Sequence, residues 1–371
     1  MLYLHIPFCH HKCTYCGFYS VAGSRYRDAY VGALCDELRM RSSQQQLKTV
    51  YFGGGTPSIL SLQQLQRIVD TIRDNYDTSA LQEVTLEANP ENLTPSYLDG
   101  LAAMRFVNRL SIGIQSFRDD ELHRINRVHS AQQAREAIHN AAASGFENVS
   151  IDLIMGLPGQ TCDDFQTNLD ALASLPDVEV VKHLSCYELT VEEGSILERQ
   201  LRMGRLALPA EQTLVEEYGK LYDWCEVHGF EQYEVSNFCR PGYASRHNSG
   251  YWIRTPYLGV GAAAHSFDGT CRRWNVADIQ RYVDGTAQGM VPFEEEQLSE
   301  RDAYNEYLMT ALRTVDGIDL ERVPPSLRER LAMAVKPFVR QGLLTKTPQG
   351  YKPTRQGLLH ADGMAATLFV V

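Results

Sequence analysis

The sequence lacks the features of a membrane or secreted protein. It has no basic signal region at its start, no apolar run long enough to cross a bilayer and no lipidation motif. We therefore expect no integral membrane segment and a cytoplasmic location, with peripheral membrane contact left open. An excess of positive charge is missing as well, because the 371 residues carry a net charge of -11. That balance argues against a surface for nucleic acid.

A fourth cysteine is missing from the one loop that is rich in them. Cys9, Cys13 and Cys16 follow the spacing C-x-x-x-C-x-x-C. A closed zinc site would need a fourth thiolate or a well-placed histidine, and His10 and His11 lie awkwardly inside the first gap. A disulfide would leave one thiol over, and three unrelated core cysteines are the plain alternative. Three thiolates can instead hold three irons of a four-iron cluster and leave the fourth iron open.

The other cysteines fit a reducing environment. The chain has nine cysteines in all, an odd number, and the remaining six are expected to be mostly buried thiols. Apolar content of 44% is ample for a large core.

Strand-like apolar runs alternate with helical stretches through the first half of the chain. Helical patterns such as those at 62–75 and 131–144 separate six such runs, at 2–6, 49–52, 83–87, 108–115, 149–154 and 180–189. Six βα units predict an α/β protein with a parallel sheet, and their number indicates a partial (β/α)6 barrel of the TIM type. Chemistry in such folds collects at the carboxyl ends of the strands.

Polar residues do stand at those predicted strand ends. Cys9 follows the first strand and a run of glycines ending in Thr56 follows the second, while Glu87, Gln115 and Asp152 come at the third, fourth and fifth. Carboxylates and amides are costly to bury without partners, so they are expected to meet a polar ligand or each other. Ordinary capping of strand ends is the alternative for any one of them.

The cysteine spacing and the run Gly-Gly-Gly-Thr-Pro at 53–57 resemble the radical S-adenosylmethionine (SAM) superfamily. The resemblance implies a 4Fe-4S cluster on Cys9, Cys13 and Cys16, bound SAM and an electron donor to the cluster. It also implies that Phe8, Tyr15 and Phe18 shield the cluster from water. In the subgroup that resembles oxygen-independent coproporphyrinogen oxidase, the positions implied to contact SAM are Tyr3, Gly54, Gly55, Thr56, Glu87, Gln115, Arg127 and Asp152.

Two features separate the members of this subgroup. The oxidases carry a further cysteine where this chain has Phe18, and a longer arm before the motif than the eight residues here. The run His-Asn-Ser-Gly-Tyr at 247–251 resembles the H-N-x-x-Y pattern of the HemW-type heme chaperones, as do the segments at 233–238 and 259–266. This resemblance implies a protein that binds heme and hands it to heme-accepting apoproteins.

The same resemblance names candidate heme ligands. His247 would bind the iron and Tyr251 would supply a second donor or a hydrogen bond, with His265 and Cys239 as weaker candidates. A histidine in a polar loop that is merely hydrogen-bonded is the alternative for His247. For the whole chain, the alternatives are a radical coproporphyrinogen III dehydrogenase and a radical methyltransferase or heme-modifying enzyme on the same scaffold.

The character of the chain changes near residue 285. Residues 288–297 contain Pro292 and three consecutive glutamates, a pattern typical of a linker, and a helix is expected from Ala303 onward. A hairpin predicted after residue 342 completes the outline of a winged-helix module. We therefore expect a barrel domain with the heme-binding segment at 1–285 and a linker with a small domain at 286–371. With ten basic and eight acidic residues from 300 on, the small domain is expected to cover the barrel or dock a partner.

Overall fold

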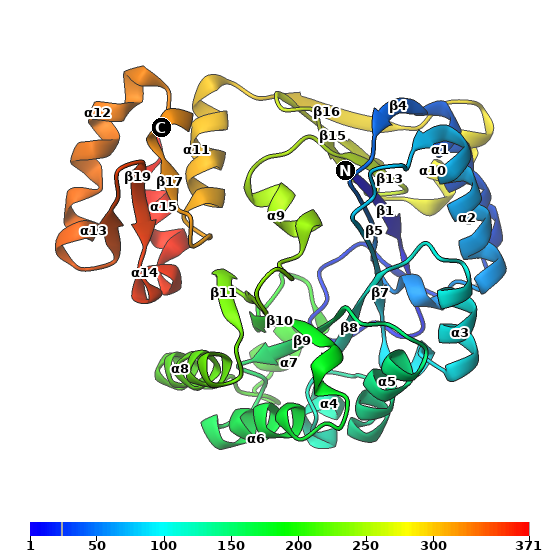
Figure 1. The fold of residues 1–371 in the computed structure, drawn as a ribbon, viewed down its shortest axis with the longest axis horizontal. Helices are drawn as coiled ribbons and strands as arrows, with labels where there is room; N and C mark the ends of the chain where they lie inside the picture. Colours follow the sequence, from blue (N-terminus) through cyan, green and yellow to red (C-terminus); the bar gives the residue numbers. More distant parts are fainter. Residues whose placement is uncertain (24, 371) are drawn as a thin grey trace.

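The computed structural model describes residues 1–23 and 25–370, and its centre is a sheet of parallel strands (Figure 1). Neighbouring strands pair in the order in which they occur along the chain. The six parallel strands are β1 (Leu2–Ile6), β5 (Thr49–Gly54), β7 (Glu83–Ala88), β8 (Arg109–Gln115), β9 (Val149–Met155) and β10 (Val181–Glu188). All six strands predicted from the sequence are present, and the partial barrel is confirmed.

Helices cover the outer face of this sheet. Ser61, Ser130 and Thr161 begin α2, α5 and α6 with capping boxes, in which the cap side chain and the third helical residue satisfy each other's backbone N–H groups. The helices between the parallel strands and just after β10 are α1 (Arg27–Met40), α2 (Leu62–Asn75), α3 (Pro95–Ala103), α4 (Asp119–Arg124), α5 (Ala131–Ala143), α6 (Cys162–Ala173), α7 (Ile196–Arg202) and α8 (Glu211–Val227). Two short strands, β4 (Ser43–Gln46) and β6 (Tyr76–Asp77), pair beside them.

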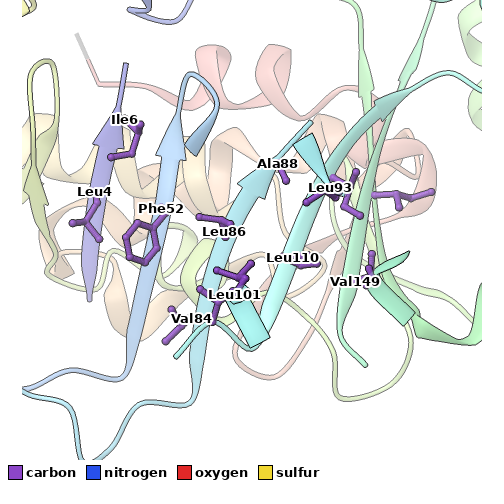
Figure 2. Close-up of a cluster of buried hydrophobic side chains, with 14 of the residues drawn as sticks. Leu4, Ile6, Phe52, Val84, Leu86, Ala88, Leu93, Leu101, Leu110 and Val149 are labelled. Carbon is purple, nitrogen blue, oxygen red and sulfur yellow. The ribbon is translucent and has the colours of Figure 1, made fainter. Parts of the chain in front are cut away.

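Alternate residues of the strands face the helices and the barrel interior. Leu4, Phe52, Leu86 and Leu110 are adjacent in register and fully buried, and Figure 2 shows this row with Leu101 of α3. The other set is unusually polar: the neighbouring row is formed by Tyr3, Tyr51, Thr85 and Arg109. Barrels of this kind are commonly filled by branched apolar side chains. Here the interior is built for polar contacts.

Three further strands extend the sheet beyond the six that were predicted. β13 (Leu258–Val260) pairs parallel to β1 at one edge. At the other edge, β12 (Asn237–Cys239) pairs antiparallel to β10, and β11 (Glu231–Glu234) pairs with β12. The nine-stranded sheet therefore runs from β11 to β13.

A short helix, α9 (Arg246–Trp252), lies at the amino-terminal end of the barrel strands. Glu83, the first residue of β7, accepts hydrogen bonds from the backbone N–H groups of Arg246 and His247 at 2.8 and 3.0 Å. It also accepts one from the Ser245 hydroxyl at 3.2 Å. A carboxylate at this position satisfies N–H groups that a helix leaves unpaired. The segment expected to be a polar loop is thus a helix, anchored by a distant strand.

A small antiparallel sheet lies beside the edge that β13 forms. Its strands are β14 (His265–Phe267), β15 (Cys271–Asn275) and β16 (Phe293–Gln297), and α10 (Ile279–Ala287) lies between the last two in sequence. The prediction of a plain linker at 288–297 was wrong in part, since β16 occupies much of it. Two of its three glutamates stand opposite arginines, with Arg272 paired to Glu296 and Arg273 to Glu295 across the strands. Such opposite-charge pairs stabilise a strand that its own sequence would not favour.

The carboxy-terminal residues have a hydrophobic core of their own, from Tyr304 to Leu368. The hairpin predicted after residue 342 is present. Its elements are α11 (Glu300–Ala311), β17 (Ile318–Asp319), α12 (Pro325–Ala334), α13 (Lys336–Arg340), β18 (Leu344–Lys346), β19 (Gly350–Pro353), α14 (Arg355–Leu359) and α15 (Ala361–Leu368). Glu306 of α11 forms ion pairs with Arg254 at 2.5 Å and Arg272 at 2.9 Å, which join this unit to the barrel. Among the described residues, no helix is long and apolar enough to cross a membrane.

Candidate functional site

The three cysteines of the first loop face a single cavity. The loop starts at β2 (Phe8–Cys9) and returns at β3 (Val21–Ala22), and these two strands pair in parallel and close it. Within the loop, the backbone N–H of Cys16 donates to the carbonyl of Cys13 at 3.4 Å. All three thiols are free and half-buried. The structure therefore holds three thiols in one preformed loop at the carboxyl end of β1.

The cavity has a volume of about 390 Å³ and lies at the carboxyl ends of the barrel strands. Residues from all six parallel strands or the loops that follow them meet there, five of them at the polar strand ends that the sequence predicted. Besides the three cysteines, the predicted residues that line it are Gly54, Gly55, Thr56, Glu87, Gln115, Arg127 and Asp152. The binding roles of these residues stay predictions, but the fold does bring them together at one cavity.

Two predicted residues are not among those lining the cavity. Tyr3 packs in the layer below, where its ring stacks on Tyr51 and its hydroxyl lies 3.1 Å from Nδ1 of His5. The implied contact between Tyr3 and SAM stays a prediction. Phe8 lies in the core against Tyr30, whereas Tyr15 and Phe18 do line the cavity.

Arg127 brings to the cavity a cation that, among the described residues, has no carboxylate within ion-pair distance. Its Nη1 donates to Oδ1 of Asn89 at 3.0 Å, and its buried Nε has no hydrogen-bond partner among the described residues. Within the same residues it forms no ion pair with a carboxylate. A buried guanidinium left in this state is costly unless an anion completes its contacts. Arg127 is therefore suited to hold a carboxylate supplied by a ligand.

Two carboxylates of the cavity are held without a contacting cation in the described structure. Glu87 accepts hydrogen bonds from the Tyr51 hydroxyl at 2.8 Å and the Gly54 N–H at 3.2 Å, and its burial raises its pKa to about 7. Asp152 accepts one from the Ser111 hydroxyl at 3.4 Å, and its burial raises its pKa to about 6. Both acids keep free oxygen lone pairs, so they are suited to accept hydrogen bonds from amino or hydroxyl groups.

Gly113 of β8 leaves room for the side chains of Gln115 and Arg127. A Cβ atom on Gly113 would lie 2.9 Å from Nε2 of Gln115 and 3.1 Å from Nη2 of Arg127. Gln115 itself has φ of 67°, a left-handed conformation that a non-glycine residue rarely adopts. Strain of this kind gathers at functional sites. Gly113 is a site residue that the sequence analysis missed.

The donor set fits a four-iron cluster with an amino-acid ligand beside it. Among the described residues, no three His, Cys, Asp or Glu side chains gather closely enough to hold one metal ion. A cluster does not require that, because each thiolate binds a different iron. The unpaired Nε of Arg127 would supply a donor of opposite charge for the carboxylate of SAM, and the open oxygens of Glu87 and Asp152 would supply hydrogen-bond acceptors for its amino and ribose hydroxyl groups.

Some residues of the cavity were not predicted. The end of β10 and the loop after it contribute Tyr187, Leu189 and Glu192. The rule that chemistry collects at strand carboxyl ends applies to the sixth strand too and would have found them. Tyr51 does not line the cavity but donates a hydrogen bond to Glu87, and it was also missed, although it shares one face of β5 with Thr49 and Gly53.

His247 lies at the other end of the barrel from the cluster loop. It is fully buried in α9, with Nδ1 2.8 Å from the Thr49 hydroxyl and Nε2 3.0 Å from the Tyr251 hydroxyl. Burial lowers its pKa to about 3, and the nearby chain terminus and Arg109 act in the same direction. Both ring nitrogens are occupied, so in this arrangement neither is open to a heme iron. Cys239 is buried in β12, whereas His265 is exposed.

Comparisons with known proteins agree with this fold. Residues 3–172 match the radical SAM superfamily, and residues 298–360 match the HemN C-terminal domain. The chain is similar to the heme chaperone HemW of Bacillus subtilis, with 36% identity covering 96% of each chain. It is 30% identical to HemW of Escherichia coli K12, covering 98% of this chain and 96% of that one.

Two further proteins are similar to this chain. The mitochondrial radical S-adenosyl methionine domain-containing protein 1 of Bos taurus is 32% identical, covering 99% of this chain and 86% of its own length. The solved structure of the E. coli coproporphyrinogen III oxidase HemN, a radical SAM enzyme, superposes with a TM-score of 0.85 at 23% identity and covers 100% of this chain and 89% of that one. At such identity the likeness concerns the fold. The sequence of this chain is similar over nearly its full length to several proteins named heme chaperone HemW. This similarity shows that the chain belongs to the heme chaperone HemW family of the radical SAM superfamily.

Proposed function

We propose that this chain is a heme chaperone, which binds heme and delivers it to apoproteins, and that it carries a 4Fe-4S cluster and SAM. The observation that carries the proposal is its similarity, over nearly the whole length, to proteins named as HemW heme chaperones. The cavity supports the cofactor part, because three thiols there adjoin a cation and two acids that contact no counter-ion within residues 1–23 and 25–370.

Each residue of the cavity has a proposed task. Cys9, Cys13 and Cys16 would hold the cluster, and Arg127 would pair with the methionine carboxylate of SAM. Glu87 would accept hydrogen bonds from the amino group, and Asp152 from the ribose hydroxyls. When bound, the cluster and SAM would supply one-electron chemistry. Tyr15 and Phe18 would limit the access of water to the cluster, which affects its reduction potential.

The sequence at the cavity rim separates this proposal from porphyrinogen oxidation. Phe18, which stands where the resembling oxidases carry a further cysteine, lines the cavity with 69% of its surface exposed. An apolar side chain there supplies neither a thiolate nor a charge. We therefore expect coproporphyrinogen to remain unchanged by the protein.

The proposal is tested on the full chain after anaerobic cluster reconstitution. Three assays run in parallel: hemin titration, transfer of bound heme to apomyoglobin as a probe acceptor, and turnover of coproporphyrinogen III with SAM and a reductant. We expect heme binding and transfer without release of carbon dioxide from the porphyrinogen. Decarboxylation would establish the oxidase alternative, and absence of heme binding would reject the chaperone.

A further inference from the structure

A second cavity lies away from the cluster site, beside the small sheet and α10. Its volume is about 440 Å³, within the range of pockets for cofactor-sized molecules. It is lined mainly by apolar residues from β15, β16 and the segments that flank α10. The lining residues that the argument uses are His265, Trp274, Arg281, Met290, Phe293 and Glu294. We call this cavity the β14–β16 groove.

His265 brings an imidazole with no side-chain hydrogen bond in the described structure to this groove. It is the first residue of β14 and is exposed, and its ring stacks beside Trp274 with the centroids 5.9 Å apart. Partial burial lowers its pKa, with the charge of Arg272 acting in the same direction, and both effects favour the neutral ring. A neutral imidazole with an open nitrogen is the form that binds heme iron.

The walls of the groove offer apolar surface and one cation. Met290 and Phe293, which both line the groove, are 62% and 44% exposed, so the groove presents apolar surface to solvent. Arg281 is exposed and, among the described residues, forms no ion pair with a carboxylate. Glu294 is the one acid on the lining, so an anionic group of a ligand would be drawn toward Arg281 and repelled from Glu294.

The groove also borders the cluster loop. α10, which carries Arg281, begins with a backbone N–H that donates to the Tyr19 hydroxyl at 2.9 Å. Tyr19 lies in the loop that carries the three cysteines, and its backbone carbonyl is 3.0 Å from Nε2 of His5. The groove and the cluster cavity are therefore joined through one short segment, without sharing a lining residue.

We propose that the β14–β16 groove is the heme-binding site, with the His265 imidazole as axial ligand, Arg281 paired with a propionate, and Trp274, Met290 and Phe293 against the macrocycle. This inference rests on the proposed function and names the site at which the cargo binds. The alternative axial ligand, His247, has both ring nitrogens in hydrogen bonds, one with Thr49 and one with Tyr251. Tyr251 borders a third cavity, but its hydroxyl is turned to His247 rather than free for a ligand.

The test is a hemin titration of the full chain and three histidine variants. His265→Ala should shift the Soret band and weaken heme binding at least tenfold, and added free imidazole should restore the band by filling the vacated position. His247→Gln should leave the Soret band in place. The matched control is His139→Ala, which removes another exposed histidine, one that is paired with Asp177 on the surface of α5. A further variant, Arg281→Ala, should weaken binding severalfold with the Soret band unchanged, since the ligand itself is kept.

The outcomes separate this inference from the proposed function. No heme binding by the wild-type chain would reject the chaperone and the groove together. Heme binding that His265→Ala leaves unaltered would reject the groove alone, as would a Soret shift confined to His247→Gln. Circular dichroism and cluster content, measured on each variant, show whether a loss of binding reflects loss of the fold.

Discussion

The Tyr51 hydroxyl donates a hydrogen bond of 2.8 Å to Oε1 of Glu87. The same Tyr51 ring packs against the His247 ring, with centroids 5.1 Å apart, at the other end of the barrel. One side chain thus contacts both the acid that faces the cluster cavity and the buried histidine of α9. A substitution of Tyr51 should change the pKa of Glu87, because that contact is a hydrogen bond to an ionisable group.

We expect Tyr51→Phe to move the pH dependence of SAM binding upward. Binding should weaken as the pH falls through about 7, because protonation removes an acceptor site from Glu87. The Tyr51 hydroxyl holds that pKa down, so its loss raises it by about one to two units if the bond contributes ~1.5–3 kcal/mol. Calorimetric titrations of the reconstituted protein between pH 6 and 9 measure the shift. Tyr97→Phe is the matched control, because the buried Tyr97 hydroxyl has no partner among the described residues. A superimposable profile for Tyr51→Phe would contradict the role given to Glu87.

Removal of Arg127 should weaken SAM binding without loss of the cluster. If its guanidinium holds the methionine carboxylate, Arg127→Ala costs about 2–5 kcal/mol, because the partner charge is left unpaired. Arg124→Ala is the control, since Arg124 instead pairs with Asp120. Affinity is read by calorimetry and cluster content by iron analysis. Equal affinities of Arg127→Ala and the wild type would remove Arg127 from the site.

The cluster should depend on the loop cysteines and on no other. Cys13→Ala is expected to abolish the brown chromophore, whereas Cys35→Ala should retain it, because Cys35 is buried in α1 away from the cavity. Absorption spectra and iron content after reconstitution decide this. A full cluster in Cys13→Ala, or its loss in Cys35→Ala, would show that the ligand set is different.

Glu83→Gln should destabilise the fold through α9. The carboxylate is 5% exposed and accepts three hydrogen bonds at the start of that helix. Replacement by an amide weakens bonds to a charged acceptor, at a cost of about 1–3 kcal/mol in the free energy of unfolding. Urea denaturation measures it. Glu147→Gln, at an exposed glutamate, should stay within about 0.5 kcal/mol of the wild type. Equal midpoints for the two variants would mean that Glu83 does not anchor the helix.

The sequence was most informative where structure depends on local pattern. The barrel strands were predicted within two residues, because each is a run of apolar residues bounded by helices, and the rule of strand carboxyl ends then brought Glu87, Gln115 and Asp152 together. Arg127 came from family resemblance alone, since it follows a short helix instead of a strand. Sequence pattern did not predict the elements that depend on long-range contacts. α9 contains Gly250 and is anchored by hydrogen bonds to Glu83, more than 160 residues earlier, and β16 depends on arginines of β15.

The unpaired charges at the cluster cavity also affect the stability of the protein against proteolysis. Arg127, Glu87 and Asp152 lack counter-ions in contact within the described structure, so the unfilled site stores electrostatic cost that a bound ligand would remove. Whatever binds the folded chain alone raises its stability in proportion to the logarithm of its concentration over its dissociation constant. The filled protein should therefore open less often to proteases than the empty one, and a supply of cofactor would set its turnover as well as its activity.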